Sequence, residues 1–194
     1  MTDITVGFAM CGSFCTFEKA LAGMKELVGA GWRVQPIQSR TAAATDTRFG
    51  RATDFRRRAE QLTGRPIIDS ITAAEPIGPQ GLCDLLIVAP CTGNTLAKLA
   101  ASATDTPVTM AVKSQLRGGR PVLIALSTND GLAGSLQNLA ALAVRRHYFF
   151  VPMVQDDPIG KPTSLVADYR LLLPAAKAAL AGRQLRPLFL TAED

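Results

Sequence analysis

The sequence predicts an α/β protein with a doubly wound parallel sheet and helices on both faces of that sheet. Strand-like runs rich in Val, Ile and Leu alternate along the chain with helical segments of roughly ten residues or more, which is typical of βαβ units. The run CDLLIVAP (83–90) is continuously apolar after its first two residues, as in a strand that helices cover on both faces. Because parallel crossovers are right-handed, we expect a Rossmann-like or flavodoxin-like three-layer sandwich.

The expected elements follow this alternation in order. Strands are expected over residues 3–10, 32–39, 83–90, 120–127 and 147–154. Helices are expected over residues 17–31, 52–64, 131–146 and about 163–181, with further helical segments over roughly 94–116. Residues 40–50 are expected to form a polar loop, and the Pro and Gly residues of 65–82 predict a passage of turns.

The spacing of apolar residues and the positions of capping residues justify the helices. In the first helix, Leu21, Met24 and Leu27 recur at helical spacing and share one face. In the second helix, Thr53 is a candidate N-cap and Gly64 a candidate stop.

The composition bounds the class of protein. A chain of 194 residues suits one domain, and we expect a single domain over residues 1–194. The apolar runs are far shorter than a membrane span, and no basic segment precedes the first of them, so we expect neither a membrane span nor a signal peptide. Four cysteines without a C-x-x-C pair indicate a reduced, cytoplasmic protein.

Charge and side-chain types narrow the ligand. The net charge of +5 is compatible with an anionic ligand or with nucleic acid, but an aromatic content of 6% leaves little for base stacking, so we expect no nucleic-acid partner. With a single histidine in the chain, we expect no His-based metal site.

The loops that follow the first four strands are rich in Ser, Thr, Gly and Asn. They read CGSFCT (11–16), SRTAAAT (39–45), PCTGNT (90–95) and STND (127–130). In an open parallel sheet these loops share the carboxyl edge, where ligands bind near the reversal of strand order. Each loop has a simpler interpretation, since a Ser, Thr or Asn in it would cap the following helix. The four loops together favour a site for a phosphate, a sugar-like chain and a polar heterocycle.

Two common nucleotide motifs are absent. No G-x-G-x-x-G follows the first strand, because Gly7 and Gly12 have the wrong spacing, and there is no G-x-x-x-x-G-K-[ST]. A mononucleotide such as FMN therefore fits better than a dinucleotide. We expect its phosphate near Gly12, Ser13 and Ser39 and its ring near residues 92–95. The complete set of candidate cofactor residues is Gly12, Ser13, Ser39, Thr41, Pro90, Thr92, Gly93, Asn94, Thr95 and Ser127.

The segment APCTGNTLAKLA (89–100) resembles a motif of the flavoprotein family that includes cysteine decarboxylases and flavin prenyltransferases. That family carries A-P-x-[ST]-[AG]-N-T-x-A-K-x-A, and every defined position of the motif is matched here. The loop CGSFCT (11–16) is similar to the first flavin loop of the family. The resemblance implies a single flavoprotein domain that binds FMN.

A denser resemblance to one branch of this family extends over most of the chain. Its segments include TDTRFG (45–50), TDTPVTMAVKSQLRGGRPV (104–122), YFFVPMVQDDP (148–158) and KPTSLVA (161–167). It implies an FMN-binding protein that acts with an NAD(P)-binding A subunit. The pair would oxidise dihydrodipicolinate to dipicolinate during bacterial spore formation, in the cytoplasm of the mother cell.

Two alternatives remain open: a decarboxylase or prenyltransferase of the same fold, and a non-catalytic FMN-binding partner protein. The family's decarboxylases use a histidine near the flavin and a P-x-M-N-x-x-M loop. Here the corresponding loop reads STND, with Asn129 but without the flanking Pro and Met, and His147 begins the fifth strand at the opposite edge. No catalytic residue is assigned, and Cys91 in the flavin loop is either a reactive thiol or a small residue that gives clearance.

A dicarboxylate substrate would require cations near the flavin. We assign Arg48 and Asn129 to substrate binding, Arg48 because its loop leaves the second strand on the ligand edge. Arg57 is expected on a solvated face. The apolar tail RPLFL (186–190) and the stretch HYFFVPMV (147–154) predict a homo-oligomer built on trimers.

Overall fold

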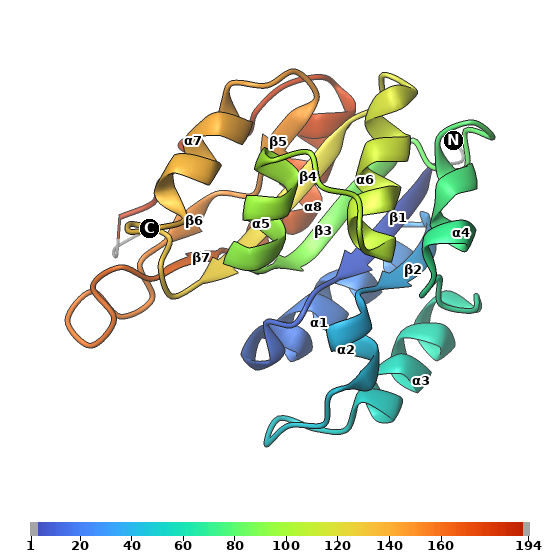
Figure 1. Cartoon of the computed structure of the whole chain (residues 1–194), viewed down its shortest axis with the longest axis horizontal. Coiled ribbons are helices and arrows are strands. Elements are labelled where there is room, and N and C mark those ends of the chain that lie inside the picture. Colours follow the sequence, from blue (N-terminus) through green and yellow to red (C-terminus); the bar gives the residue numbers. More distant parts are fainter. Residues whose placement is uncertain (1–3, 192–194) are drawn as a thin grey trace.

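The computed structural model describes residues 4–191, so the expected strand start at residue 3 and both ends of the expected 1–194 domain lie outside it. Five parallel strands form the main sheet in the order β2-β1-β3-β4-β5 (Figure 1). They are β1 (Thr5–Met10), β2 (Arg33–Gln38), β3 (Leu85–Cys91), β4 (Val122–Thr128) and β5 (Tyr148–Phe150). This order is that of flavodoxin-like folds and confirms the predicted class.

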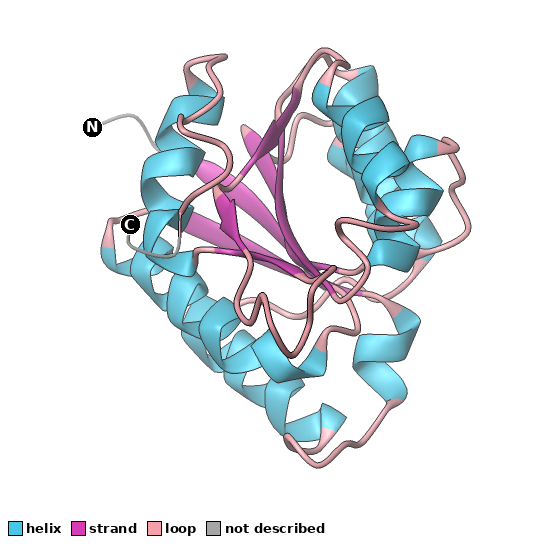
Figure 2. Ribbon diagram, turned by 90° about the vertical axis from the view of Figure 1, so that its left-hand side faces the viewer, coloured by secondary structure: helices cyan, strands magenta, loops and turns pink. Residues whose placement is uncertain are grey.

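Helices cover both faces of the sheet, as Figure 2 shows. On one face, α1 (Phe17–Gly29), α3 (Ala52–Thr63) and α8 (Leu172–Leu180) bury one apolar cluster. On the other face, α5 (Gly93–Ala100), α6 (Pro107–Arg117) and α7 (Leu136–Ala143) bury a second apolar cluster. The three expected layers are therefore present. None of the helices within residues 4–191 is long and apolar enough to cross a membrane.

Two short strands depart from the expected sheet. The predicted fifth strand divides into β5 and β6 (Met153–Val154), and β7 (Leu165–Ala167) occupies the start of the predicted helix 163–181. β7 pairs antiparallel with the end of β4 and with β6. The helix prediction was wrong there because Leu165 and Ala167 are buried while Val166 is partly exposed, which is the period of a strand.

Other differences lie in the connections. The predicted loop 40–50 begins with a short helix, α2 (Arg40–Ala44), and the passage 65–82 contains α4 (Ile71–Ala74) and a 3₁₀ turn at Glu75–Ile77. Helix α7 is shorter than predicted, since residues 131–135 form turns.

The predicted limits of α3 were half right. Thr53 is not the N-cap, because Arg51 occupies that position without a side-chain bond. The carboxylate of Asp46 instead accepts a hydrogen bond from the Ala52 amide at 2.8 Å, which satisfies a free N–H of the first turn. Gly64 ends the helix at φ 65°, a left-handed conformation that favours glycine.

Strand order reverses between β1 and β3, because β2 lies on one side of β1 and the later strands lie on the other. The loops after β1 and β3 meet at this point, where the Cys11 amide donates to the Pro90 carbonyl at 3.1 Å. Ligands of open parallel sheets bind outside such a reversal.

Candidate functional site

The carboxyl ends of β1, β3 and β4 surround a pocket of about 340 Å³. Their arrowheads end on one side of the molecule in Figure 1, the side from which the β6–β7 loop also projects. The lining residues are Gly12, Ser13, Cys15, Thr16, Lys19, Thr92, Gly93, Ser127, Thr128, Asn129, Asp156, Lys161 and Val166. Half of the predicted cofactor and substrate residues thus line one cavity.

The loop after β1 crosses to the loop after β4. The Ser13 hydroxyl donates to the Ser127 hydroxyl at 3.0 Å, although β3 lies between their two strands. Neither Ser13 nor Thr16 caps a helix with its side chain, and the Thr16 hydroxyl donates to the Ser13 carbonyl at 2.8 Å. Capping therefore does not account for these two hydroxyls.

The loop after β3 both caps a helix and lines the pocket. Thr92 caps α5, since its hydroxyl oxygen accepts from the Thr95 amide at 3.2 Å, and Thr92 also lines the pocket. The first amides of α5 have no partner inside the helix and lie at its positive end.

Gly93 is required by its surroundings. A Cβ atom at this position would lie 2.6 Å from the Ser135 Oγ, 2.7 Å from the Thr128 Oγ1 and 2.9 Å from an Asp130 carboxylate oxygen. The start of α5 therefore packs directly against the loop after β4.

Asp130 organises the loop after β4. Its carboxylate accepts hydrogen bonds from Thr128 and, at 2.8 Å, from Ser135. The hydrogen bond from Thr128 contributes most to holding the pKa of Asp130 below its usual value. The carboxylate therefore stays ionised at neutral pH and keeps Thr128 at the pocket wall.

Charged residues enter the pocket from α1 and from the β6–β7 loop. They are Lys19, Asp156 and Lys161, and the Lys161 Nζ lies 2.9 Å from a carboxylate oxygen of Asp156. Burial opposes ionisation of Asp156, but the hydrogen bonds from Lys161 and Ser164 lower its pKa. Sequence reasoning missed all three. Asp156 and Lys161 reach the site because β7 pairs with β4, and Lys19 reaches it because the first turn of α1 follows the loop after β1.

The remaining predicted cofactor residues surround the pocket without lining it. Ser39 is buried and caps α2, accepting from the Ala42 amide at 3.2 Å. The Thr41 methyl lies 3.1 Å from the position a Cβ of Gly12 would take. Pro90 contributes the carbonyl that binds the loop after β1. Thr95 is buried beneath Thr92, and Asn94 is exposed.

Arg48 lies away from the pocket lining. Its side chain is exposed, and its guanidinium carbon lies 4.9 Å from the ring centre of Phe49. Asn129, by contrast, lines the pocket, and its backbone carbonyl accepts a hydrogen bond from the Thr163 hydroxyl at 2.6 Å.

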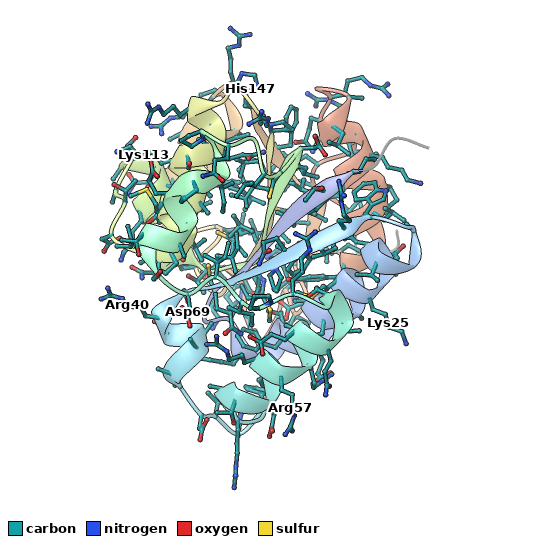
Figure 3. All side chains as sticks on the ribbon, turned by 90° about the vertical axis from the view of Figure 1, so that its right-hand side faces the viewer. Lys25, Arg40, Arg57, Asp69, Lys113 and His147 are labelled. Carbon is teal, nitrogen blue, oxygen red and sulfur yellow. The ribbon has the colours of Figure 1, made fainter. Side chains whose placement is uncertain are left out.

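The far end of the molecule holds His147. Figure 3 shows it opposite Arg57, pointing outward. Its carbonyl accepts from the Val122 amide at the start of β4, so it lies at the amino edge of the sheet, as the sequence predicts. Arg57 is exposed and pairs with Asp54 at 2.7 Å, which fits the expected solvated face.

Two of the four thiols are enclosed beside the loops. Burial raises the pKa of Cys11 to about 11 and that of Cys91 well above its usual value. Cys91 is completely buried and its thiol donates to the Thr92 carbonyl at 3.6 Å. Cys91 is therefore protonated at neutral pH and fills space under the loop. Cys15 is exposed at the pocket.

Residues 1–166 match the model of a family described as Flavoprotein. The chain belongs to the Flavoprotein family. This confirms the assignment that residues 89–100 support. Within this family, the chain is 43% identical over 183 residues to the B subunit of dipicolinate synthase from Bacillus subtilis (strain 168), covering 94% of this chain and 92% of that protein.

Solved structures agree with this assignment. The crystal structure of the dipicolinate synthase B subunit from Bacillus halodurans C has a TM-score of 0.89 and 40% identity, covering 97% of this chain and 96% of that one. The FMN-dependent cysteine decarboxylase SpaF has a TM-score of 0.70 at 20% identity, covering 92% of this chain and 97% of that one. At that identity SpaF shows a shared fold alone.

Proposed function

We propose that this chain is the FMN-binding B subunit of a dipicolinate synthase. With an NAD(P)-binding A subunit, it would oxidise dihydrodipicolinate to dipicolinate in the mother-cell cytoplasm of a sporulating bacterium. The 43% identity to a protein of that name, over 94% of this chain, supports the proposal. We further propose that residues 1–194 act as a single flavoprotein domain.

The pocket at the reversal of strand order is the observation that carries the FMN assignment. Its walls are mainly neutral hydroxyl groups and the start of α5, which together suit a phosphate, a ribityl chain and a heterocycle. Gly12, Ser13, Thr92, Gly93 and Ser127 would hold the cofactor, with Ser39, Thr41, Pro90, Asn94 and Thr95 supporting them from behind or beside. FMN, when bound, supplies a two-electron acceptor.

The chain's own task is to orient the substrate. Loss of a hydride and a proton from a dihydropyridine is driven by aromatisation, so placement of the ring beside the acceptor contributes more than a strong base does. We propose that Asn129 donates its side-chain amide to the substrate. Arg48 is proposed as a second contact, which requires the 45–50 turn to fold over the pocket.

A cysteine-decarboxylase or prenyltransferase activity has less support. The loop after β4 lacks the Pro and Met residues of the decarboxylase motif, and His147 lies at the opposite edge of the sheet. The described pocket thus lacks the imidazole that those decarboxylases use near the flavin. The experiment described next distinguishes a non-catalytic role for bound FMN from the proposed role as electron acceptor.

The test follows the visible flavin spectrum. The purified protein is reconstituted with FMN and mixed anaerobically first with dihydrodipicolinate and then with NAD(P)⁺. In a separate run, NAD(P)H is added to the reconstituted protein. Each run is made with and without the A subunit. We expect the flavin to bleach with dihydrodipicolinate and to recover with NAD(P)⁺ only when the A subunit is present. An A subunit that oxidises the substrate at full rate alone, with no change in the flavin, would contradict the proposal.

A further inference from the structure

The cations of the pocket come from two elements only, α1 and the β6–β7 loop. Its walls are neutral apart from Lys19, Asp156 and Lys161. Neither lysine belongs to the loop after β3, since Lys19 lies on α1 and Lys161 on the β6–β7 loop. The loops that follow the strands therefore supply neutral lining residues, and two other elements supply the charged ones.

Lys161 is held beside the pocket by its loop. The Thr163 hydroxyl donates to the Asn129 carbonyl at 2.6 Å, and the Leu132 amide donates to the Thr163 carbonyl at 2.9 Å. The Ser164 amide donates to the Lys161 carbonyl at 3.0 Å. These bonds join the Lys161 segment to the loop after β4, so the fold sets the position of the Lys161 backbone beside the pocket.

The partner of Lys161 can be exchanged. Asp156 Oδ2 accepts from Lys161 at 2.9 Å, while Oδ1 accepts from the Ser164 hydroxyl at 2.8 Å. The pair is half exposed, with 50% of the Lys161 side chain and 35% of the Asp156 side chain accessible, so the ion pair itself is weak. A ligand carboxylate can take the place of Asp156 at the ammonium group while Asp156 keeps its bond to Ser164.

Resting on the proposed function, we propose that Lys161 and Lys19 form the carboxylate-binding end of the pocket and select a dianionic pyridine acid over a monoanionic one. Asp156 holds Lys161 in place when the site has no substrate, and it competes with the substrate for that lysine. Arg48, proposed above as a contact from the 45–50 turn, does not line the pocket and is the alternative cation for the substrate carboxylates.

The experiment measures binding to the FMN-loaded protein by calorimetry, with pyridine-2,6-dicarboxylate and pyridine-2-carboxylate as probes. The variants are Lys161→Ala, Lys19→Ala, the double variant that combines these two changes, Asp156→Asn and Arg48→Ala. Lys25→Ala, an exposed lysine on the same helix as Lys19 that points outward in Figure 3, is the control. FMN content is measured for every variant.

We expect Lys161→Ala to raise the Kd of the dicarboxylate about fivefold, and the double lysine variant to raise it at least about tenfold. Asp156→Asn should lower the Kd about twofold, because it frees Lys161 and removes a repelling charge; loss of a merely structural ion pair would not tighten binding. The monocarboxylate should bind more weakly than the dicarboxylate to the parent protein and respond less to each change. FMN content should stay within about twofold.

Equal dicarboxylate affinity of the Lys161→Ala and parent proteins overturns the inference, as does a loss of affinity that is confined to Arg48→Ala. The inference is also overturned if Asp156→Asn does not bind the dicarboxylate more tightly than the parent protein, or if the parent protein does not bind it at all. Turnover with the A subunit is assayed in parallel. Normal turnover with no effect of the lysines overturns this inference alone, whereas absence of both flavin and turnover overturns the proposed function.

Discussion

Gly93 determines how closely α5 approaches the loop after β4. A methyl group there would lie within 2.9 Å of three polar atoms, from Thr128, Asp130 and Ser135. We expect Gly93→Ala to weaken FMN binding at least about tenfold and to lower the free energy of unfolding by about 1–3 kcal/mol. Fluorescence titration and urea unfolding measure the two effects.

Gly29→Ala is the matched control, because a Cβ there meets nothing within 4 Å and Gly29 ends α1 far from the pocket. It should leave FMN binding unchanged. Unchanged FMN affinity in Gly93→Ala would contradict the role given to this glycine.

The four thiols should differ sharply in reactivity. Cys11, Cys83 and Cys91 are buried with raised pKa values, whereas Cys15 is exposed at the pocket. We expect iodoacetamide at neutral pH to modify Cys15 alone in the native protein, and FMN to slow that reaction. Peptide mass spectrometry measures it, and rapid labelling of Cys91 would show that this thiol is open to solvent.

About half of the residues that line the candidate site could be predicted from the sequence. Ser13, Thr92 and Ser127 could be predicted because the ends of parallel strands share one edge, and the structure brings all three to one pocket. Lys161 could not, because nothing local in the chain specifies that the β6–β7 loop turns back onto β4. That contact depends on the pairing of Ser127 with Val166.

Among the elements, the strands were predicted best where burial on both faces leaves an unbroken apolar run, as in β3 and β4. The segment 163–171 was predicted as helix because it leads into the true helix α8. Its residues 165–167 form a strand because hydrogen bonding to the unpaired edge of β4 overrides local propensity.

The element that joins β7 to α8 should carry part of the acid sensitivity. Asp168 caps the 3₁₀ turn at Tyr169–Leu171, accepting from the Arg170 amide at 2.9 Å. Hydrogen bonding from the Arg170 side chain lowers the pKa of Asp168 in the folded state. Its contribution to stability is therefore full above about pH 5 and is lost as pH falls through about 4 and below.

The free energy of unfolding, measured against pH, should thus fall less steeply below about pH 5 in Asp168→Asn than in the parent protein. Some fall remains in both proteins, because Glu18, Asp130 and Asp156 have lowered pKa values too. Parallel curves for the two proteins would contradict the role of Asp168.

At the scale of the whole molecule, apolar surface gathers beside the C-terminal segment. Phe189 is 54% exposed and Leu132 39%, and both line one hollow of about 370 Å³. The stretch 147–154 does not contribute as expected, because Phe150, Val151 and Met153 are buried in the core. The exposed surface is therefore the part that supports an oligomer.

We propose a homo-oligomer built on trimers that uses this surface. Phe189→Glu should shift the mass from light scattering toward the monomer, because it buries a charge in an apolar contact. Val144→Glu, at a residue that is 85% exposed at the end of α7, is the control and should leave the mass unchanged. A monomer of the parent protein at micromolar concentration would contradict the proposal.

The central claim is that the loops at the carboxyl edge of the sheet hold one FMN per chain. The purified protein is incubated with FMN and FAD at equal concentrations, each in excess over the protein, and unbound flavin is then removed. The protein is denatured, and the released cofactor is identified and quantified by mass spectrometry. Because the pocket of about 340 Å³ lies in a fold without a dinucleotide motif, we predict FMN at one per chain and no FAD. Recovery of FAD, or of no flavin at all, would contradict the account.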